Sequence, residues 1–256
     1  MNNSKCDSVC VIPTLKRPEF LALCLEKLSL TPEIENIDVR IYLDWAPEGR
    51  LAEVEYVRDT YLPTAEIFQA HTHVIAPSGT WNILYALKSG WETGAEFIYM
   101  VEEDVMVRPE FFQKHRELQA SGDYFVTCGR RCGHMPLDFY SNPGSCYRRE
   151  KFAHVIPHIN MQYFANLAGY TNEHFPHMDD VGILDDGLIR RVMRSINGKA
   201  ICADPPIAIH QGFHYYNRLE PWLNREGTIQ ERIQKLREML PTVDPKGRYS
   251  RDFEPF

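Results

Sequence analysis

The sequence has 256 residues, of which 44% are hydrophobic and 25% charged, and its formal net charge is −7. This is the composition of a folded globular chain of one or two domains, and it excludes the disordered, collagen-like and coiled-coil classes. The surplus of acidic residues argues against a general nucleic-acid coat protein, although it leaves room for a local basic patch.

Short apolar runs alternate with helical patterns through the first hundred residues. The runs are rich in β-branched or aromatic residues and predict buried strands at residues 9–13, 39–43 and 97–101. Pro18 opens a predicted helix with one apolar face, and a second helix is predicted over residues 80–88, with Gly90 closing it. This alternation predicts a mostly parallel sheet with helices on both faces.

The later part of the chain predicts two further helices, at residues 187–196 and 228–240, and short strands at residues 124–128, 200–203 and 207–209. Thr228 and Glu231 have the spacing of a capping box, in which each side chain accepts a hydrogen bond from the other residue's backbone N–H. Pro241 then stops the apolar pattern, so residues 228–240 are expected to form one amphipathic helix.

Polar residues directly follow three of the predicted strands: Thr14 with Lys16 and Arg17, Asp44 with Trp45, and Glu102 with Glu103 and Asp104. Ligands of parallel sheets bind outside the carboxyl ends of the strands. The three polar groups therefore predict a binding site along one edge of the sheet.

The run Glu102–Asp104 places three carboxylates together at the end of an apolar strand. Carboxylates that are close together and partly desolvated repel one another, and a divalent cation relieves the repulsion. Mg²⁺ and Mn²⁺ prefer such oxygen ligands. The run therefore indicates a Mg²⁺ or Mn²⁺ site, and a solvated acidic turn is the plainer alternative.

Two further groups of residues are candidates for a catalytic or ligand-binding role. Asp185 and Asp186 stand at the start of a predicted helix, where they could serve as a general base or only stabilise the helix N-terminus. His210 ends a short β-like segment and His214 follows it, so a contact to metal or phosphate and a structural role both stay open.

Taken together, these residues resemble those of the GT-A glycosyltransferases. The opening VCVIPTLKRPEFLALCLEKL is similar to the family's first strand and helix, and VEEDVMVRPEFF is similar to its metal motif in the Glu-Glu-Asp form of the glycoprotein N-acetylglucosaminyltransferases. SNPGSCYRREKF resembles the glycine loop, and LDDGLIRRV resembles the late helix that carries the base. The chain departs from the family in having Glu first in the metal motif, in having Asp-Asp for Glu-Asp, and in lacking the Gln/Arg-x-x-Arg-Trp signature of processive synthases.

The resemblance implies an α/β GT-A fold with a mostly parallel sheet and a C-terminal helical extension, divided into a glycosyltransferase domain at residues 1–215 and a helix and tail at residues 216–256 packed on it. It also implies an inverting hexosyl- or pentosyltransferase that moves a sugar from a nucleotide-sugar donor to an acceptor hydroxyl with Mn²⁺ or Mg²⁺. One base and one direct displacement are enough for this reaction.

The resemblance also assigns roles to residues. Asp104 and His210 would bind the metal, and Asp186 would be the base, with Asp185 as its alternative. The donor would contact Pro13, Thr14, Arg17, Asp44, Trp45, Gly79, Asn82, Glu102, Glu103, Gly144 and Ser145. Of these, Thr14, Arg17 and Asp44 would hold the nucleoside, whereas Gly144 and Ser145 would line the sugar or acceptor side.

The acceptor is open among glycans, lipid-linked sugars, proteins and modified DNA bases, since all of them present hydroxyls. A phosphate-bearing acceptor would suit a set of basic residues, namely Arg130, Arg131, Arg148, Arg149 and Lys151. Two other classes compete with a transferase: a nucleotide-sugar-binding module without catalysis, and a metal-dependent hydrolase. The hydrolase would use the cluster His174, His177, Asp179 and Asp180, with His71 and His73 as further candidates.

The compartment is inferred from the cysteines and from the start of the sequence. The seven cysteines are scattered and odd in number, and the first residues lack the basic and apolar pattern of a secretory signal. No stretch reaches the roughly 18 apolar residues of a membrane span. We therefore expect a cytoplasmic protein with free thiols and without a membrane span.

Overall fold

The computed structural model describes residues 6–14, 17–44, 50–70, 79–130, 143–211 and 227–240. Its centre is a seven-stranded sheet with the order β3-β2-β1-β4-β7-β6-β8. The strands are β1 (Ser8–Thr14), β2 (Asp38–Leu43), β3 (Glu66–Gln69), β4 (Phe97–Met100), β6 (Val126–Cys128), β7 (Ser145–Arg148) and β8 (Ala200–Cys202). A two-stranded sheet pairs β5 (Val105–Val107) with β9 (Ala208–His210).

The sheet is parallel except for one strand. β1 pairs in parallel with β2 and β4, β2 with β3, and β6 with β8. β7 runs antiparallel to both of its neighbours, β4 and β6. The mostly parallel sheet expected from the sequence is therefore confirmed, and β7 is an antiparallel strand that the sequence pattern did not predict.

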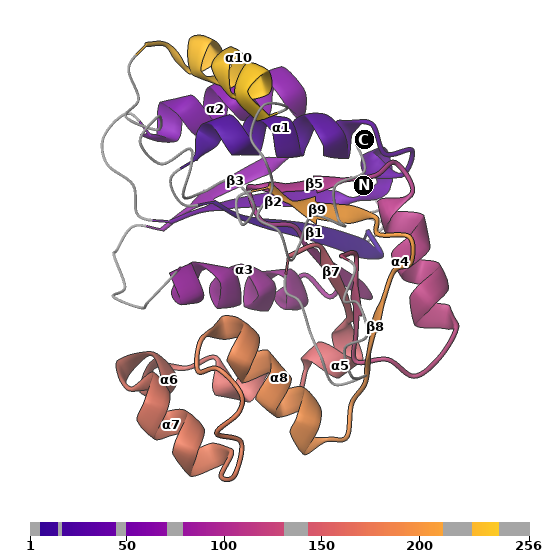
Figure 1. Ribbon diagram of the computed structural model, residues 1–256, viewed down its shortest axis with the longest axis vertical. Coiled ribbons are helices and arrows are strands. Elements are labelled where there is room, and N and C mark those ends of the chain that lie inside the picture. Colours follow the sequence, from indigo (N-terminus) through magenta and orange to yellow (C-terminus); the bar gives the residue numbers. More distant parts are fainter. Residues whose placement is uncertain are drawn as a thin grey trace, which may run out of the picture.

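Helices cover both faces of the sheet (Figure 1). One side carries α1 (Pro18–Ser29), α2 (Arg50–Tyr61) and α10 (Ile229–Met239), and the other carries α3 (Thr80–Glu92) and α8 (Asp185–Ser195). The remaining helices are α4 (Phe111–Ala120), α5 (Arg149–Phe152), α6 (Met161–Ala165) and α7 (Leu167–His174), with short 3-10 helices at Ile34–Asn36 and Ile156–His158. No helix in the described ranges is long and apolar enough to cross a membrane.

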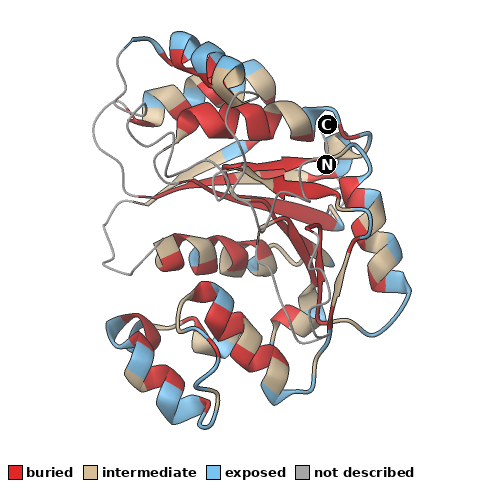
Figure 2. Ribbon diagram, in the orientation of Figure 1, coloured by how far each residue is buried: buried red, intermediate tan, exposed pale blue. Residues whose placement is uncertain are grey.

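The alternation of side chains along β1 builds two apolar layers. Cys10 and Ile12 point into the layer formed with α1, α2 and α10, whereas Val9 and Val11 point into the layer formed with α3 and α8. All seven residues of β1 are buried, which is expected for a central strand covered on both sides (Figure 2). Each such aliphatic side chain contributes roughly 1.5–3 kcal/mol to folding when it is fully buried.

Gly90 lies inside α3, although the sequence placed it at the end of this helix. A Cβ atom at this position would stand 2.9 Å from Val11 Cγ1 and 3.2 Å from Ile98 Cγ2. The glycine therefore allows α3 to approach β1 and β4 closely, and the helix continues to Glu92.

The last described helix is tied to the first two. The capping box of Thr228 and Glu231 forms as predicted. The Arg232 guanidinium donates from Nε to Glu19 Oε1 on α1 at 2.6 Å and also pairs with Glu53 on α2. These contacts join α10 to the layer of α1 and α2, while the division into residues 1–215 and 216–256 stays a prediction.

The cysteines differ in one respect from expectation. Cys6, Cys10, Cys24, Cys128 and Cys146 are free, as predicted. Cys202, in β8, is disulfide-bonded, so the expectation of free thiols is wrong for this residue. Scattered sequence positions give no indication of such a pairing, because the fold decides which cysteines meet.

Candidate metal and transfer site

The carboxyl end of β4 leads directly into the acidic turn, which we define as Glu102, Glu103 and Asp104. The backbone N–H of Val105 closes the turn on the carbonyl of Glu102 at 2.9 Å, and β5 follows at once. β5 then pairs in antiparallel register with β9, in which Val105 faces His210. This pairing brings a histidine from the far part of the chain onto the acidic turn.

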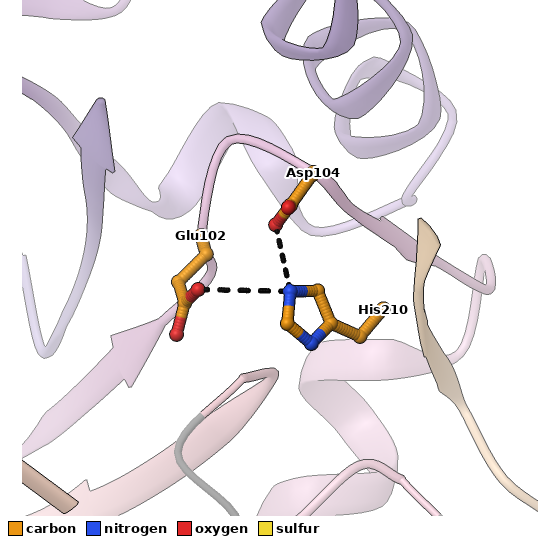
Figure 3. A group of neighbouring side chains, drawn as sticks. All are labelled: Glu102, Asp104 and His210. Carbon is orange, nitrogen blue, oxygen red and sulfur yellow. Dashed lines mark ion pairs between the residues drawn. The ribbon is translucent and has the colours of Figure 1, made fainter. Parts of the chain in front are cut away.

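Glu102, Asp104 and His210 point toward one another (Figure 3). His210 Nε2 lies 3.1 Å from Asp104 Oδ1 and 3.8 Å from Glu102 Oε2. One ligand atom from each residue falls within 4.8 Å of the others. Two carboxylate oxygens and an imidazole nitrogen are a donor set that fits Mn²⁺ or Mg²⁺, with Mn²⁺ favoured by the nitrogen. The described part of the chain holds no other such group.

The two carboxyl groups of this set have opposite pKa shifts. Burial raises the pKa of Glu102 to about 7, and the negative charges of Asp104 and Asp185 add to the effect against His210 and Arg17. For Asp104, burial also acts to raise the pKa, but the charges of His210 and Arg17 outweigh it and hold the pKa well below its usual range. Asp104 is therefore an anion throughout the neutral range, while Glu102 gains or loses its proton near neutrality.

Arg17, at the start of α1, forms ion pairs with two residues of the acidic turn. Its Nη1 stands 2.7 Å from Asp104 Oδ2, and its Nε donates to Glu103 Oε1 at 2.9 Å. The resemblance assigned Arg17 to the nucleoside and Glu103 to the donor, through ribose, sugar or a water on the metal, and those roles stay predictions. The structure ties both side chains to the centre of the candidate metal site.

The ends of β1 and β2 are held together next to the turn. The Asp44 N–H donates to the Thr14 carbonyl at 3.0 Å. Asn82, in the first turn of α3, donates from Nδ2 to the same carbonyl at 3.2 Å and to that of Tyr42 at 2.9 Å. Pro13, Thr14 and Asp44 are buried at this edge. The predicted donor contacts Thr14, Asp44 and Asn82 therefore form one connected group, whereas Trp45 and Lys16 lie outside the described residues.

α8 begins at Asp185, two residues earlier than predicted, so that both aspartates stand in its first turn, where negative charge is favoured. Asp185 is 7% exposed and accepts a hydrogen bond from Thr80 Oγ1 at 3.1 Å. Asp186 is exposed, and its Oδ1 accepts the Gly187 N–H at 2.7 Å. Because the charge of Asp185 raises the pKa of Glu102, Asp185 belongs to the electrostatic surroundings of the acidic turn.

Thr80 is the residue that the sequence reasoning missed. It is fully buried at the start of α3, directly after Gly79, whose φ of +73° places it in the left-handed region that favours glycine. Thr80 and Asp185 are 105 residues apart in the chain, and neither motif gives a signal for their contact.

Gly144 lies in a turn directly before β7, and Ser145 is the first residue of that strand. Gly144 has a φ of +68°, and a Cβ on it would lie 2.7 Å from the Cβ of Ala208. Ser145 begins β7, is buried, and stands in register between Met100 and Cys128. Of the residues in the expected glycine loop, positions 141–142 lie outside the described ranges.

The cluster expected for a hydrolase does not gather into a donor set. The His174 ring stacks on Tyr170 with centroids 3.9 Å apart, and both oxygens of Asp180 accept hydrogen bonds from Arg194. His177 is exposed, with a φ of +68°. His71, His73 and His214 lie outside the described residues, so the structure gives no support to this centre.

The sequence matches no protein-family model and no curated protein. Solved structures do match. The mannosyltransferase PcManGT from Pyrobaculum calidifontis, in complex with GDP-Man and Mn²⁺, aligns with a TM-score of 0.54 at 12% identity, over 91% of this chain and 69% of that one. S. aureus TarS 1-349 in complex with UDP aligns with a TM-score of 0.51 at 15% identity, over 97% of this chain and 76% of that one.

The chain has the GT-A fold. A second TarS 1-349 structure agrees, with a TM-score of 0.50 at 16% identity over 91% of this chain and 70% of that one. The fold class implied by the sequence resemblance is thereby confirmed.

Proposed function

We propose that this chain is a divalent-cation-dependent glycosyltransferase that moves a sugar from a nucleotide-sugar donor to an acceptor hydroxyl with inversion at the anomeric carbon. The observation that carries the proposal is the convergence of Glu102, Asp104 and His210 at the carboxyl end of β4. The GT-A fold supports it, because PcManGT was solved with GDP-Man and Mn²⁺ and TarS with UDP.

Different residues would act on the leaving group and on the donor's nucleoside end. Asp104, His210 and Glu102 would hold the cation, which when bound offsets the charge that develops on a departing nucleoside diphosphate. Thr14, Asp44 and Asn82 would position the nucleoside end of the donor. The metal could be Mn²⁺ or Mg²⁺, and the transferred sugar could be a hexose or a pentose.

Asp185 is the base that the geometry favours. The Thr80 hydroxyl donates to its Oδ1 and so orients this buried carboxylate, which in this role would take the proton of the acceptor hydroxyl. Asp186, the base assigned from the sequence, stays the alternative, although its exposed carboxylate turns back onto the N–H of Gly187.

The proposal is tested by nucleotide binding. UDP and GDP are titrated calorimetrically against wild type and Asp104→Asn, each with Mn²⁺ and with chelator. We expect Mn²⁺ to raise the affinity of one nucleotide for wild type at least about tenfold, because a cation held by Glu102, Asp104 and His210 would attract the phosphate charge, and to have no effect on the variant. Asp59→Asn, which removes a 64% exposed carboxylate of α2, is the matched control and should behave as wild type.

Equal affinities in all of these titrations would contradict the proposal. A sugar-nucleotide-binding module without catalysis would instead show the Mn²⁺ effect on nucleotide affinity but no sugar transfer to any acceptor. Wild type and a variant at Asp185 would then be equally inactive.

The affinity for Mn²⁺ is expected to depend on pH through Glu102. Because its pKa is raised to about 7, the group is protonated below neutrality and must release a proton to bind the cation. The apparent affinity should therefore fall as the pH is lowered from 7, by up to about tenfold per pH unit from this group alone. Mn²⁺ titrations between pH 5.5 and 8 measure the slope.

Glu102→Gln is the control for this prediction. The variant should bind Mn²⁺ more weakly at pH 8 and should lose the part of the slope that Glu102 contributes. An unchanged slope in Glu102→Gln would show that another group controls the binding.

A further inference from the structure

The acidic turn is paired with a positively charged side chain, that of Arg17. The Arg17 guanidinium pairs with Asp104 at 2.7 Å and with Glu103 at 2.9 Å, and the Arg17 backbone N–H also points to Glu103 Oε2 at 3.4 Å. Glu103 and Asp104 are almost fully buried, with side chains 3% and 1% exposed, while the Arg17 side chain is 20% exposed. Arg17 thus compensates two buried carboxylates while part of its own side chain stays exposed to solvent.

The two oxygens of Asp104 have different neighbours. Oδ2 faces Arg17, and Oδ1 faces His210 within the candidate metal donor set. A divalent cation bound through Oδ1 would therefore share one carboxylate with the guanidinium. Two cations held this close repel each other, and screening by water is weak where the carboxylate is buried.

A nucleoside diphosphate changes this balance. Its phosphate oxygens are acceptors for guanidinium N–H groups, and their negative charge attracts both Arg17 and the divalent cation. The repulsion that opposes the cation alone is therefore compensated when the diphosphate is present.

We propose that Arg17 couples cation binding to donor binding: its fixed charge weakens the binding of a divalent cation to the empty acidic turn and strengthens the binding of the donor diphosphate. Arg17 is a positioning and coupling residue in this inference, which rests on the proposed function. Thermodynamic linkage requires the coupling to be reciprocal, so the donor and the cation each raise the affinity of the other.

The test compares Arg17→Gln, which removes the charge, with Arg17→Lys, which keeps it. Three affinities are measured by calorimetry for each protein: Mn²⁺ alone, and UDP and GDP in the presence of chelator. For Arg17→Gln we expect Mn²⁺ to bind about tenfold more tightly and the preferred nucleotide about tenfold more weakly. Arg17→Lys keeps the charge but not the two nitrogens that pair with Glu103 and Asp104, so both of its affinities should lie between those of wild type and of Arg17→Gln.

The opposite signs separate this role from structural damage, which would weaken both ligands. Weaker Mn²⁺ binding by Arg17→Gln, or unchanged affinities for both ligands, would overturn the inference while leaving the proposed function intact. If Arg17→Gln shows no cooperative unfolding transition, the same titrations compare Glu103→Gln with the double variant Arg17→Gln/Glu103→Gln, in which the buried Glu103 carboxylate is not left without its cation. Tighter Mn²⁺ binding together with weaker nucleotide binding by the double variant supports the inference, and any other result overturns it.

Failure of the proposed function gives a different result. Wild type would then bind neither Mn²⁺ nor a nucleotide in these titrations, and the inference would fall with it.

Discussion

Asp185→Asn is expected to lower the rate of sugar transfer by about 10²–10⁴-fold while leaving donor affinity nearly unchanged. The amide keeps the size of the side chain and can still accept the hydrogen bond of Thr80, but it cannot take a proton from the acceptor hydroxyl. Turnover with saturating donor, together with calorimetric donor affinity, measures the two effects separately.

Asp186→Asn is the matched control for this prediction. It removes one carboxylate from the same helical turn, at an exposed position where Oδ1 accepts the N–H of Gly187. We expect little loss of turnover. The reverse outcome, an inactive Asp186→Asn and an active Asp185→Asn, would restore the assignment made from the sequence. Two active variants would exclude a base from this pair and call for the anomeric configuration of the product.

Arg232→Met is expected to destabilise the protein by about 3–5 kcal/mol, because it leaves the Glu19 carboxylate buried without its cation. Arg232 is 7% exposed and Glu19 is 1% exposed, and the same guanidinium also holds Glu53. The free energy of unfolding from urea denaturation is the measurement.

Arg237→Met tests whether burial is the cause. Arg237 lies on the same helix and pairs with Glu26 at 3.0 Å, but the two side chains are 37% and 39% exposed. Its loss should cost less than about 1 kcal/mol. Equal costs for the two variants would contradict the argument, and Glu19→Gln combined with Arg232→Met should recover part of the stability.

The elements that the sequence predicted share strong local patterns. β4 and the centre of β1 are continuous apolar runs, and β2 (DVRIYL) ends in one after Arg40. α10 carries both its capping box and an apolar stripe. β7 (SCYR) has no such pattern, because its burial comes from the two strands that flank it. At Gly90 the local pattern was misleading. Glycine is typical of helix ends, but this one lies inside α3 and allows the helix to pack closely against β1 and β4.

The candidate site was predictable in its residue types and less so in its contacts. A run of carboxylates after an apolar strand indicated a cation site, and the resemblance assigned Asp104 and His210 to the metal. In the structure His210 Nε2 lies 3.1 Å from Asp104 Oδ1. The choice between Asp185 and Asp186 depends on Thr80, and the surroundings of Arg17 depend on Glu103 and Asp104. These contacts join distant parts of the chain, and the printed sequence contains no signal for them.

The pairing of β5 with β9 has a consequence for how the protein matures. Val105 and His210 meet only after the chain between them has been synthesised and folded, and such long-range pairing forms slowly. A nascent chain would carry Glu102 and Asp104 without their imidazole partner. Only the fully folded chain would then have the full affinity for the cation. A cation that binds the folded chain more tightly than late folding intermediates would shift the equilibrium between them toward the folded chain.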